Sequence, residues 1–339
     1  MTTYYDDIKR VTELDLPWET LDGANILIAG ASGLIGRALV DVLMQLPDKM
    51  FHLYAGIRDW TYARNCFLKY ADTDSFTLIQ CDVTIPISLE IDFHYIIHAA
   101  SYAGPYAFQS DPVSVMKANI WGVDNLFSYG KRNHLKRFLY ISSGEVYGEG
   151  DGTLFHEENS GYLDWTSLRA CYPMAKRAAE TLCLSYAAQY QIETLIAHPC
   201  HIYGPFFTFK DDRVYAQLIR NAVANEDIVL KSLGLQRRSW CYVVDCVFAL
   251  LYILLKGETA NAYNISDIQS NASICEFAEM IAMISGQKVV YDIPDSSVNN
   301  HPVISQAIFN TDKINKTGWF PRWKLEEGVS HTLNTFFRA

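Results

Sequence analysis

The amino-acid sequence predicts an α/β fold in which a doubly wound parallel sheet is followed by a smaller C-terminal lobe. A short apolar segment, residues 25–29, runs directly into a glycine-rich turn at residues 30–36. Strand-like apolar runs then alternate with helical stretches as far as residue 199, without an internal repeat. From Phe206 onward the alternation loosens, which indicates a lobe of different construction.

Length and composition are ordinary for a globular enzyme. The 339 residues suffice for one large α/β domain with a smaller lobe. Half of the residues are hydrophobic and 19% are charged. The 28 basic and 38 acidic residues give a net charge of −10, so a nucleic-acid-binding face is not indicated.

Several features favour a cytoplasmic protein with reduced thiols. Residues 1–20 lack the apolar core of a signal peptide. The longest apolar run, 243–255, falls short of the roughly 18 residues that span a bilayer, and Asp245 within it favours a buried helix. We therefore expect no membrane partner, and we predict no metal site. The cysteines form no C-x-x-C pair and lie at Cys66, Cys81, Cys171, Cys183, Cys200, Cys241, Cys246 and Cys275.

The first elements predict a dinucleotide-binding turn. Residues 1–22 are expected to form an N-terminal extension packed on the body. The strand at 25–29 leads into Gly30, Gly33 and Gly36, and an amphipathic helix follows. In such a turn the first glycine permits the bend, the second lets backbone N–H groups approach a pyrophosphate, and the third lets helix and strand pack closely. The phosphates would lie at the positive helix N-terminus. A glycine turn without a ligand is the alternative.

This turn identifies a Rossmann-type NAD(P)-binding domain, predicted over 23–199 with 239–267 returning to it. The second strand, 51–57, ends at Arg58 and Asp59. An acidic residue here binds the ribose 2′-OH of NAD, whereas arginine accepts the 2′-phosphate of NADP. The sequence is therefore compatible with either NAD or NADP as the cofactor.

The next strands end in residues suited to the same cofactor. The strand at 76–83 ends in Asp82, which suits the adenine amino group. The strand at 94–101 ends in Ala99, Ala100 and Ser101, whose small side chains let a cofactor lie against the backbone. These ends share one edge of a parallel sheet.

The fifth strand, 138–143, follows a predicted helix at 111–131 and ends in Ser143-Gly144-Glu145. Ser143 and Glu145 therefore lie in the ligand crevice at the carboxyl ends of the strands. The plainer interpretations are a turn cap for Ser143 and a surface carboxylate for Glu145.

Tyr172 and Lys176 form a Tyr-x-x-x-Lys pair at a predicted helix start. Residues four apart share a helix face. An ammonium beside a phenol favours the phenolate and lowers its pKa, so Tyr172 is a candidate general base for an alcohol. A solvated helix face is the alternative.

The remaining chain predicts a lobe at 200–238 and 268–339. His201 follows the strand at 193–197, and Asp211-Asp212-Arg213 opens a helix. Arg237 and Arg238 lie beside aromatics and suit a diphosphate or carboxylate, with a solvated basic turn as the alternative. Two or three helices and a strand near 288–292 are expected in the tail.

Together, these motifs resemble the extended short-chain dehydrogenase/reductase superfamily, in its NAD-dependent epimerase/dehydratase branch. The resemblance runs from about residue 25 to residue 264 and is greatest for UDP-glucuronate decarboxylases. That family usually has Thr-Ser-Glu where this chain has Ser143-Gly144-Glu145, so a hydroxyl is missing at Gly144. It usually has asparagine at the position of His201.

The resemblance implies an enzyme that binds a nucleotide-diphosphate sugar and NAD tightly. Tyr172, with Lys176 and Ser143, would take the sugar 4-OH proton while hydride leaves C4. The resulting 4-keto acid would lose CO2, with Glu145 and Arg238 around the carboxylate. A 4-epimerase, a 4,6-dehydratase and a non-catalytic scaffold are the alternatives, and His201 is either a pocket acid or base or a structural histidine.

The resemblance further implies a homodimer, formed through the helix at 111–131 and the Tyr172 helix, and a place in surface polysaccharide synthesis. The implied catalytic residues are Tyr172, Lys176, Ser143 and Glu145. The implied cofactor contacts are Gly30, Ser32, Gly33, Leu34, Ile35, Gly36, Arg58, Asp59, Asp82, Val83, Ala99, Ala100, Ser101, Asn119, Tyr172, Lys176 and Pro199. The implied substrate contacts are Ser143, Gly144, Glu145, His201, Arg213 and Arg238.

Overall fold

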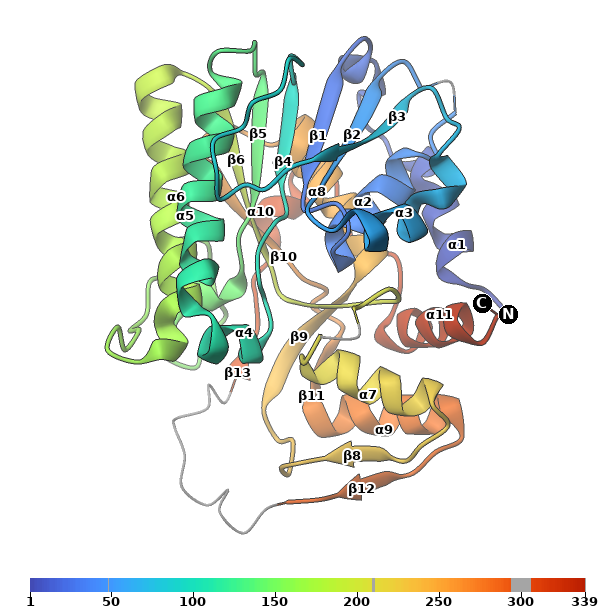
Figure 1. Ribbon diagram of the computed structural model, residues 1–339. Helices are drawn as coiled ribbons and strands as arrows, with labels where there is room; N and C mark the ends of the chain where they lie inside the picture. The colour runs from blue at the N-terminus through green and yellow to red at the C-terminus, as the bar shows by residue number, and fades with distance from the viewer. Residues whose placement is uncertain (48, 209–210, 294–305, 339) are drawn as a thin grey trace.

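A computed structural model describes residues 1–47, 49–208, 211–293 and 306–338. Its main part is a seven-stranded sheet with helices on both faces, and a smaller lobe lies below the carboxyl-terminal edge of the sheet (Figure 1). Residues 209–210, 294–305 and 339 of the predicted lobe lie outside the described residues.

The sheet is parallel throughout and confirms the predicted doubly wound fold. Its strand order, β10-β6-β5-β4-β1-β2-β3, reverses beside β1, which is where ligands bind in open α/β sheets. Several strands end earlier than predicted, so Asp82 and Ala99–Ser101 lie in the loops beyond them. The strands are β1 (Asn25–Ala29), β2 (His52–Ile57), β3 (Phe76–Gln80), β4 (Tyr95–His98), β5 (Arg137–Ile141), β6 (Glu193–Pro199) and β10 (Asn261–Ile265).

Two layers of helices cover the sheet, because alternate strand residues face opposite sides. Ile26 and Ile28 of β1 join a core with α2 (Leu34–Leu43) and α8 (Val243–Lys256). Leu27 and Ala29 join another with α5 (Pro112–Gly130) and α6 (Cys171–Tyr190). The shorter α3 (Trp60–Phe67) and α4 (Pro105–Ser110) follow β2 and β4.

Helix α8 is buried, as predicted from its sequence. Asp245 within it accepts hydrogen bonds from the backbone N–H groups of Arg322 and Trp323, at 2.8 and 3.2 Å. Burial raises the pKa of Asp245 to about 8. In the part of the chain that is described, the structure contains no helix whose length and hydropathy suffice to cross a bilayer.

In the described residues, the lobe combines a four-stranded sheet and a two-stranded sheet with several helices. β7 (His201–Tyr203) pairs with β9 (Arg237–Tyr242), which also pairs with β11 (Asn271–Ser273) and β13 (Gln306–Ala307). β8 (Ile228–Leu230) pairs with β12 (Val289–Tyr291), the strand expected near 288–292. The helices are α7 (Val214–Val223), which begins directly after Arg213, α9 (Ile274–Ser285) and α11 (Leu325–Phe337), and the short α10 (Asp312–Asn315) lies near β10.

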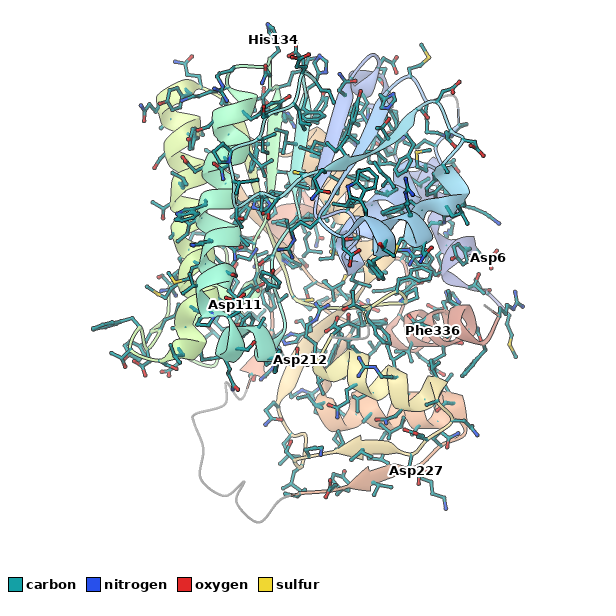
Figure 2. The ribbon with its side chains drawn as sticks, in the orientation of Figure 1. Asp6, Asp111, His134, Asp212, Asp227 and Phe336 are labelled. Atoms are coloured by element: carbon teal, nitrogen blue, oxygen red, sulfur yellow. The ribbon has the colours of Figure 1, made fainter. Side chains whose placement is uncertain are left out.

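Contacts on two sides of the lobe help to join it to the main part. On one side, the backbone N–H of Tyr106 at the start of α4 donates to Asp212 at 2.5 Å; Figure 2 shows Asp212 at this boundary. On the other side lies the N-terminal segment with α1 (Tyr4–Asp7). Tyr4 donates to Asp41 of α2, and its backbone N–H donates to Thr335 of α11, both at 3.0 Å.

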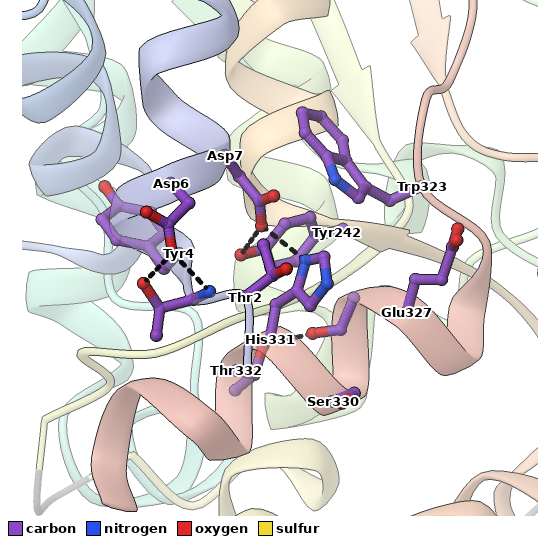
Figure 3. Close-up of polar contacts among 12 residues, drawn as sticks. Thr2, Tyr4, Asp6, Asp7, Tyr242, Trp323, Glu327, Ser330, His331 and Thr332 are labelled. Atoms are coloured by element: carbon purple, nitrogen blue, oxygen red, sulfur yellow. Dashed lines mark hydrogen bonds and ion pairs between the residues drawn. The ribbon is translucent and has the colours of Figure 1, made fainter. Parts of the chain in front are cut away.

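Asp7 lies at the centre of the contacts on the second side (Figure 3). Its Oδ2 accepts from the Tyr242 hydroxyl at 3.0 Å and contacts His331 Nδ1 at 2.8 Å. Burial raises the pKa of Asp7. The N-terminal segment therefore ties β9 and α11 together beside the sheet.

Candidate active site

The glycine turn after β1 has the geometry that a dinucleotide requires. Gly30 has a φ of +85°, and a Cβ there would lie 2.6 Å from the Ala100 backbone. A Cβ on Gly36 would lie 2.2 Å from the Gly30 carbonyl oxygen. At Gly33, in contrast, the nearest atom would be the Gly30 oxygen at 3.5 Å, an ordinary contact. A side chain at Gly30 or Gly36 would therefore clash with the protein's own backbone, whereas the space beside Gly33 is open.

This open space lies at the start of α2. Its N-cap is Gly33, and no side chain caps the first-turn N–H groups. Ser32, Leu34 and Ile35 belong to this same turn and first helical residues. The exposed N–H groups suit a pyrophosphate, so the residues present fit a dinucleotide cofactor.

The two residues after β2 have different environments. Asp59 accepts from the Tyr62 backbone N–H at 3.0 Å and caps α3. Arg58 reaches the loop after β4, where it donates to the Tyr102 hydroxyl at 2.7 Å. At the end of β3, Asp82 accepts from Thr84 N and Oγ1 at 2.9 and 2.7 Å. Both carboxylates thus have local partners, and Arg58 is the side chain that extends across the end of β1.

Other predicted cofactor residues lie around the loop after β4. Asn119 donates to Ser101 Oγ at 3.1 Å and to the Val115 carbonyl at 2.8 Å, and it accepts from Tyr140 at 3.0 Å. Its amide therefore holds the loop from inside the protein. Val83 directly follows Asp82, and Pro199 is the last residue of β6.

Tyr172, Lys176 and Ser143 come together where β5 ends and α6 begins. Ser143 caps the short 3-10 helix η4 (Gly144–Tyr147), and its hydroxyl bonds to Tyr172. The Tyr172 ring stacks on Phe108 with centroids 4.8 Å apart. Lys176, one turn further along α6, donates to the Ile141 carbonyl at 2.7 Å and lies 5.7 Å from the Tyr172 ring centroid.

The charge state of this pair differs from the prediction. Burial and the Glu145 carboxylate raise the pKa of Tyr172 to about 12, although Ser143 and nearby arginines oppose them. Burial lowers the pKa of Lys176 to about 7. In the site without ligands the pKa of the phenol is thus raised rather than lowered, because desolvation outweighs the groups that favour the phenolate.

Glu145 has a partner that the sequence interpretation did not assign. Arg169 Nη2 lies 2.8 Å from both Glu145 carboxylate oxygens. The Arg169 guanidinium also lies over the Phe108 ring at 4.6 Å. The sequence could have indicated Arg169, because it lies three residues before Tyr172, in the turn that directly precedes α6.

The basic residues of the lobe face these groups. Arg213 Nε donates a hydrogen bond to Asp211 at 2.9 Å, and the positive charge of Arg213 lowers the pKa of Tyr172. The charges of Arg238 and Arg213 lower the pKa of His201, whose side chain is exposed, and so favour its neutral form. Arg237 pairs instead with Glu276 at 3.2 Å, whereas the Glu145 carboxylate acts on the pKa of Arg238.

Gly144 lies beneath an aromatic ring that the sequence interpretation missed. A Cβ at Gly144 would lie 2.1 Å from Cζ of Phe309. Phe309 is only 2% exposed and packs against Tyr147 and Phe155. The hydroxyl missing at Gly144 is therefore replaced by an apolar wall, contributed by a residue from the far end of the chain.

A Rossmann-type sheet with a glycine turn and a Ser–Tyr–Lys set at the end of β5 defines a short-chain dehydrogenase/reductase type of protein. Residues 26–266 match the model of the NAD dependent epimerase/dehydratase family. The chain therefore belongs to this family.

Several relatives of this chain are UDP-glucuronic acid decarboxylases. UDP-glucuronic acid decarboxylase 6 of Arabidopsis thaliana is 33% identical over 311 residues, covering 90% of this chain and 86% of the relative. UDP-glucuronic acid decarboxylase 1 of Xenopus tropicalis is 30% identical over 345 residues, covering 99% of this chain and 76% of the relative.

Solved structures have the same fold at lower identity. UDP-glucuronic acid 4-epimerase from Bacillus cereus, in complex with UDP-glucuronic acid and NAD, has a TM-score of 0.78 at 22% identity, covering 93% of this chain and 99% of that one. dTDP-glucose 4,6-dehydratase from Bacillus anthracis, in complex with NAD, has a TM-score of 0.77 at 22% identity, covering 93% and 97%.

Proposed function

We propose that this protein oxidises C4 of a nucleotide-diphosphate sugar with tightly bound NAD and decarboxylates a UDP-glucuronate-like substrate through a 4-keto intermediate. The observation that carries the proposal is the meeting of Ser143, Tyr172 and Lys176 with Glu145 at the end of β5. The relatives named UDP-glucuronic acid decarboxylases support the choice of substrate.

Different residues of the chain would have different roles in this reaction. The Tyr172 phenolate would take the proton of the sugar 4-OH, and Ser143 would orient that hydroxyl. NAD, held at the glycine turn of residues 30–36, would supply the hydride acceptor, and a positive charge beside Tyr172 would favour the phenolate. Once C4 is a ketone, the substrate is a β-keto acid; its C5–C6 bond breaks, CO2 leaves, and a proton replaces it at C5. C4 would then regain its hydride and Tyr172 would return the proton to the C4 oxygen, so that NAD is regenerated and the product is a UDP-pentose.

Substrate anions would meet the basic residues of the lobe. Guanidinium groups bind diphosphate and carboxylate oxygens bidentately. The charges of Arg213 and Arg238 both lower the pKa of His201, so the two guanidinium groups lie near the same residue. Glu145 is already paired with Arg169, so a sugar carboxylate beside it would depend on Arg238 for compensation.

The main alternatives begin from the same ketone. A 4-epimerase would rotate the ketone before reduction, and the fold neighbours include one. A 4,6-dehydratase would need an acid next to Glu145, and Gly144 under Phe309 provides none. A non-catalytic scaffold would not need the Tyr172–Lys176 pair.

The products formed from UDP-glucuronate distinguish these alternatives. The purified protein with NAD should release CO2 and yield UDP-xylose, measured by mass spectrometry. Recovery of UDP-galacturonate would establish epimerisation instead. Turnover only of a UDP- or dTDP-hexose to a 4-keto-6-deoxy sugar would establish dehydration, and unchanged nucleotide sugars throughout would favour the scaffold.

Arg58 leads to a prediction about cofactor selectivity. Because Arg58 stands where NAD-specific turns carry an acid, the wild-type protein should also bind NADP. Arg58→Asp should weaken NADP binding by roughly tenfold or more, since a charge-assisted hydrogen bond contributes about 1.5–3 kcal/mol, and should favour NAD. Calorimetry on cofactor-free protein measures both affinities.

The control is Arg64→Ala, which removes another arginine from the adjacent α3, where it lies over Trp60 at 5.8 Å. It should leave both affinities unchanged. An unaltered ratio of NAD to NADP affinity in Arg58→Asp would exclude Arg58 from cofactor choice.

We also propose a cytoplasmic homodimer. All eight cysteines are free and six are buried, as suits a reducing compartment. The paired α5 and α6 expose apolar side chains, including Met116, Trp121 and Leu184, which a second copy would cover. Light scattering of the purified protein tests this assembly.

A further inference from the structure

A partly buried carboxylate, Glu180, lies one helical turn beyond Lys176 on α6. Glu180 is 17% exposed, and its Oε1 accepts a hydrogen bond from Ser142 Oγ, directly after β5. The same oxygen lies 3.0 Å from Nε2 of His198 in β6, whose side chain is 3% exposed. The reaction described above uses neither Glu180 nor His198.

The hydrogen bonds continue from His198 to Tyr147 and Asn264. Asn264 donates through Nδ2 to the carbonyls of Phe155 and Asn310, both at 3.0 Å. Carbonyls can only accept, so the amide orientation is fixed and Oδ1 faces the Tyr147 hydroxyl at 2.5 Å. Tyr147 must give its single proton to that oxygen. Burial raises the pKa of Tyr147 well above its ordinary value, so the proton stays.

These contacts also orient the ring of His198. The Tyr147 oxygen, having donated its proton, must accept from His198 Nδ1 at 2.7 Å. His198 Nε2 then lies 3.0 Å from Glu180 Oε1, which also accepts from Ser142, and a proton is shared between Nε2 and Oε1. The contacts therefore describe a hydrogen-bonded histidine–carboxylate pair that holds Glu180 in place.

The charge of Glu180 also favours the ammonium form of Lys176. The two residues are four apart on α6 and share a face. Lys176 is 2% exposed and has one neutral partner, the Ile141 carbonyl. Burial lowers the pKa of Lys176 to about 7, and the Glu180 charge opposes this shift. The other titratable or charged groups that face this pair are His98, Tyr140, Tyr147, Tyr172, Arg177, Cys183 and His198.

We propose that Glu180 is a positioning residue for the Tyr172–Lys176 pair, and that its carboxylate, held by Ser142 and His198, keeps Lys176 in its ammonium form. This inference rests on the proposed function, in which Tyr172 is the base, because a protonated Lys176 favours the Tyr172 phenolate.

Direct titration of Lys176 tests the proposal. NMR of protein labelled with 13C at lysine Cε follows the amine, and Lys176→Met identifies its signal. Glu180→Gln retains the shape and an accepting oxygen but removes the charge. Its Lys176 should titrate at a pH lower by roughly one unit or more. The alkaline limb of kcat/KM should move to lower pH with it, which a purely structural role would not cause.

Two further variants keep the test decisive. Glu193→Gln, at the exposed start of β6, removes a carboxylate that pairs with Arg137 and should shift nothing. If Glu180→Gln does not fold, Glu180→Asp keeps the charge and should retain the wild-type titration. An unshifted Lys176 in folded Glu180→Gln would overturn the inference, even where wild-type protein makes UDP-xylose. If wild-type protein does not act on nucleotide sugars, the proposed function fails, while the NMR titration still decides the role of Glu180.

Discussion

Tyr172→Phe should lower kcat on UDP-glucuronate by about a thousandfold, since a positioned general base contributes roughly 10²–10⁴-fold. The substitution removes only the hydroxyl. Tyr172 is buried and stacks on Phe108, so phenylalanine retains the packing. Binding of UDP and of NAD should be nearly unchanged, because the variant loses the proton acceptor and not a binding surface. Steady-state kinetics and calorimetry measure the two effects separately.

The matched control for this variant is Tyr190→Phe. Tyr190 is the last residue of α6, is exposed, and accepts a hydrogen bond from Gln189 at 3.1 Å. Its loss should leave kcat within twofold. If Tyr172→Phe retained more than about a tenth of the wild-type kcat, another group would have to accept the proton, and the proposed base would be wrong.

The site could be predicted from the sequence wherever its signals are local. Gly30 and Gly36 lie within one turn, and their spacing follows from the close backbone approaches that the structure shows. Tyr172 and Lys176 lie on one turn of helix, so their common face follows from helical periodicity. The parallel sheet was predictable for the same reason, because each buried strand is a short apolar run bounded by its own turn.

The contacts that the sequence did not reveal depend on tertiary packing. Asp59 is adjacent to Arg58, yet its carboxylate caps α3, which only the backbone path after β2 determines. Phe309 reaches Gly144 from the opposite end of the chain. The pKa of Tyr172 depends on how deeply the phenol is buried, and no spacing carries that information.

The contact between Gly144 and Phe309 should make Gly144→Ser strongly destabilising. The new Cβ would lie 2.1 Å from Phe309 Cζ, and the ring cannot move freely because Tyr147 and Phe155 pack on it. Overpacking of this kind typically costs about 1–3 kcal/mol. Activity should fall as well, because Ser143 and Glu145 adjoin the displaced backbone. Urea unfolding of the cofactor-free protein measures the stability change.

A double-mutant cycle isolates this contact from other effects of the substitution. Phe309→Ala alone should cost about 3–5 kcal/mol, because it leaves a cavity in a buried aromatic cluster. In Gly144→Ser/Phe309→Ala the added side chain enters that cavity, so the double variant should be more stable than the sum of the single losses by about 1–3 kcal/mol. Gly33→Ala is the control, since its Cβ would make an ordinary 3.5 Å contact and should leave the cofactor-free stability nearly unchanged. Simple additivity in the cycle would mean that Phe309 does not restrict position 144. The absence of a hydroxyl at position 144 would then not be explained by steric exclusion. Strong coupling would show that Phe309 and Gly144 together form the apolar wall beside Glu145.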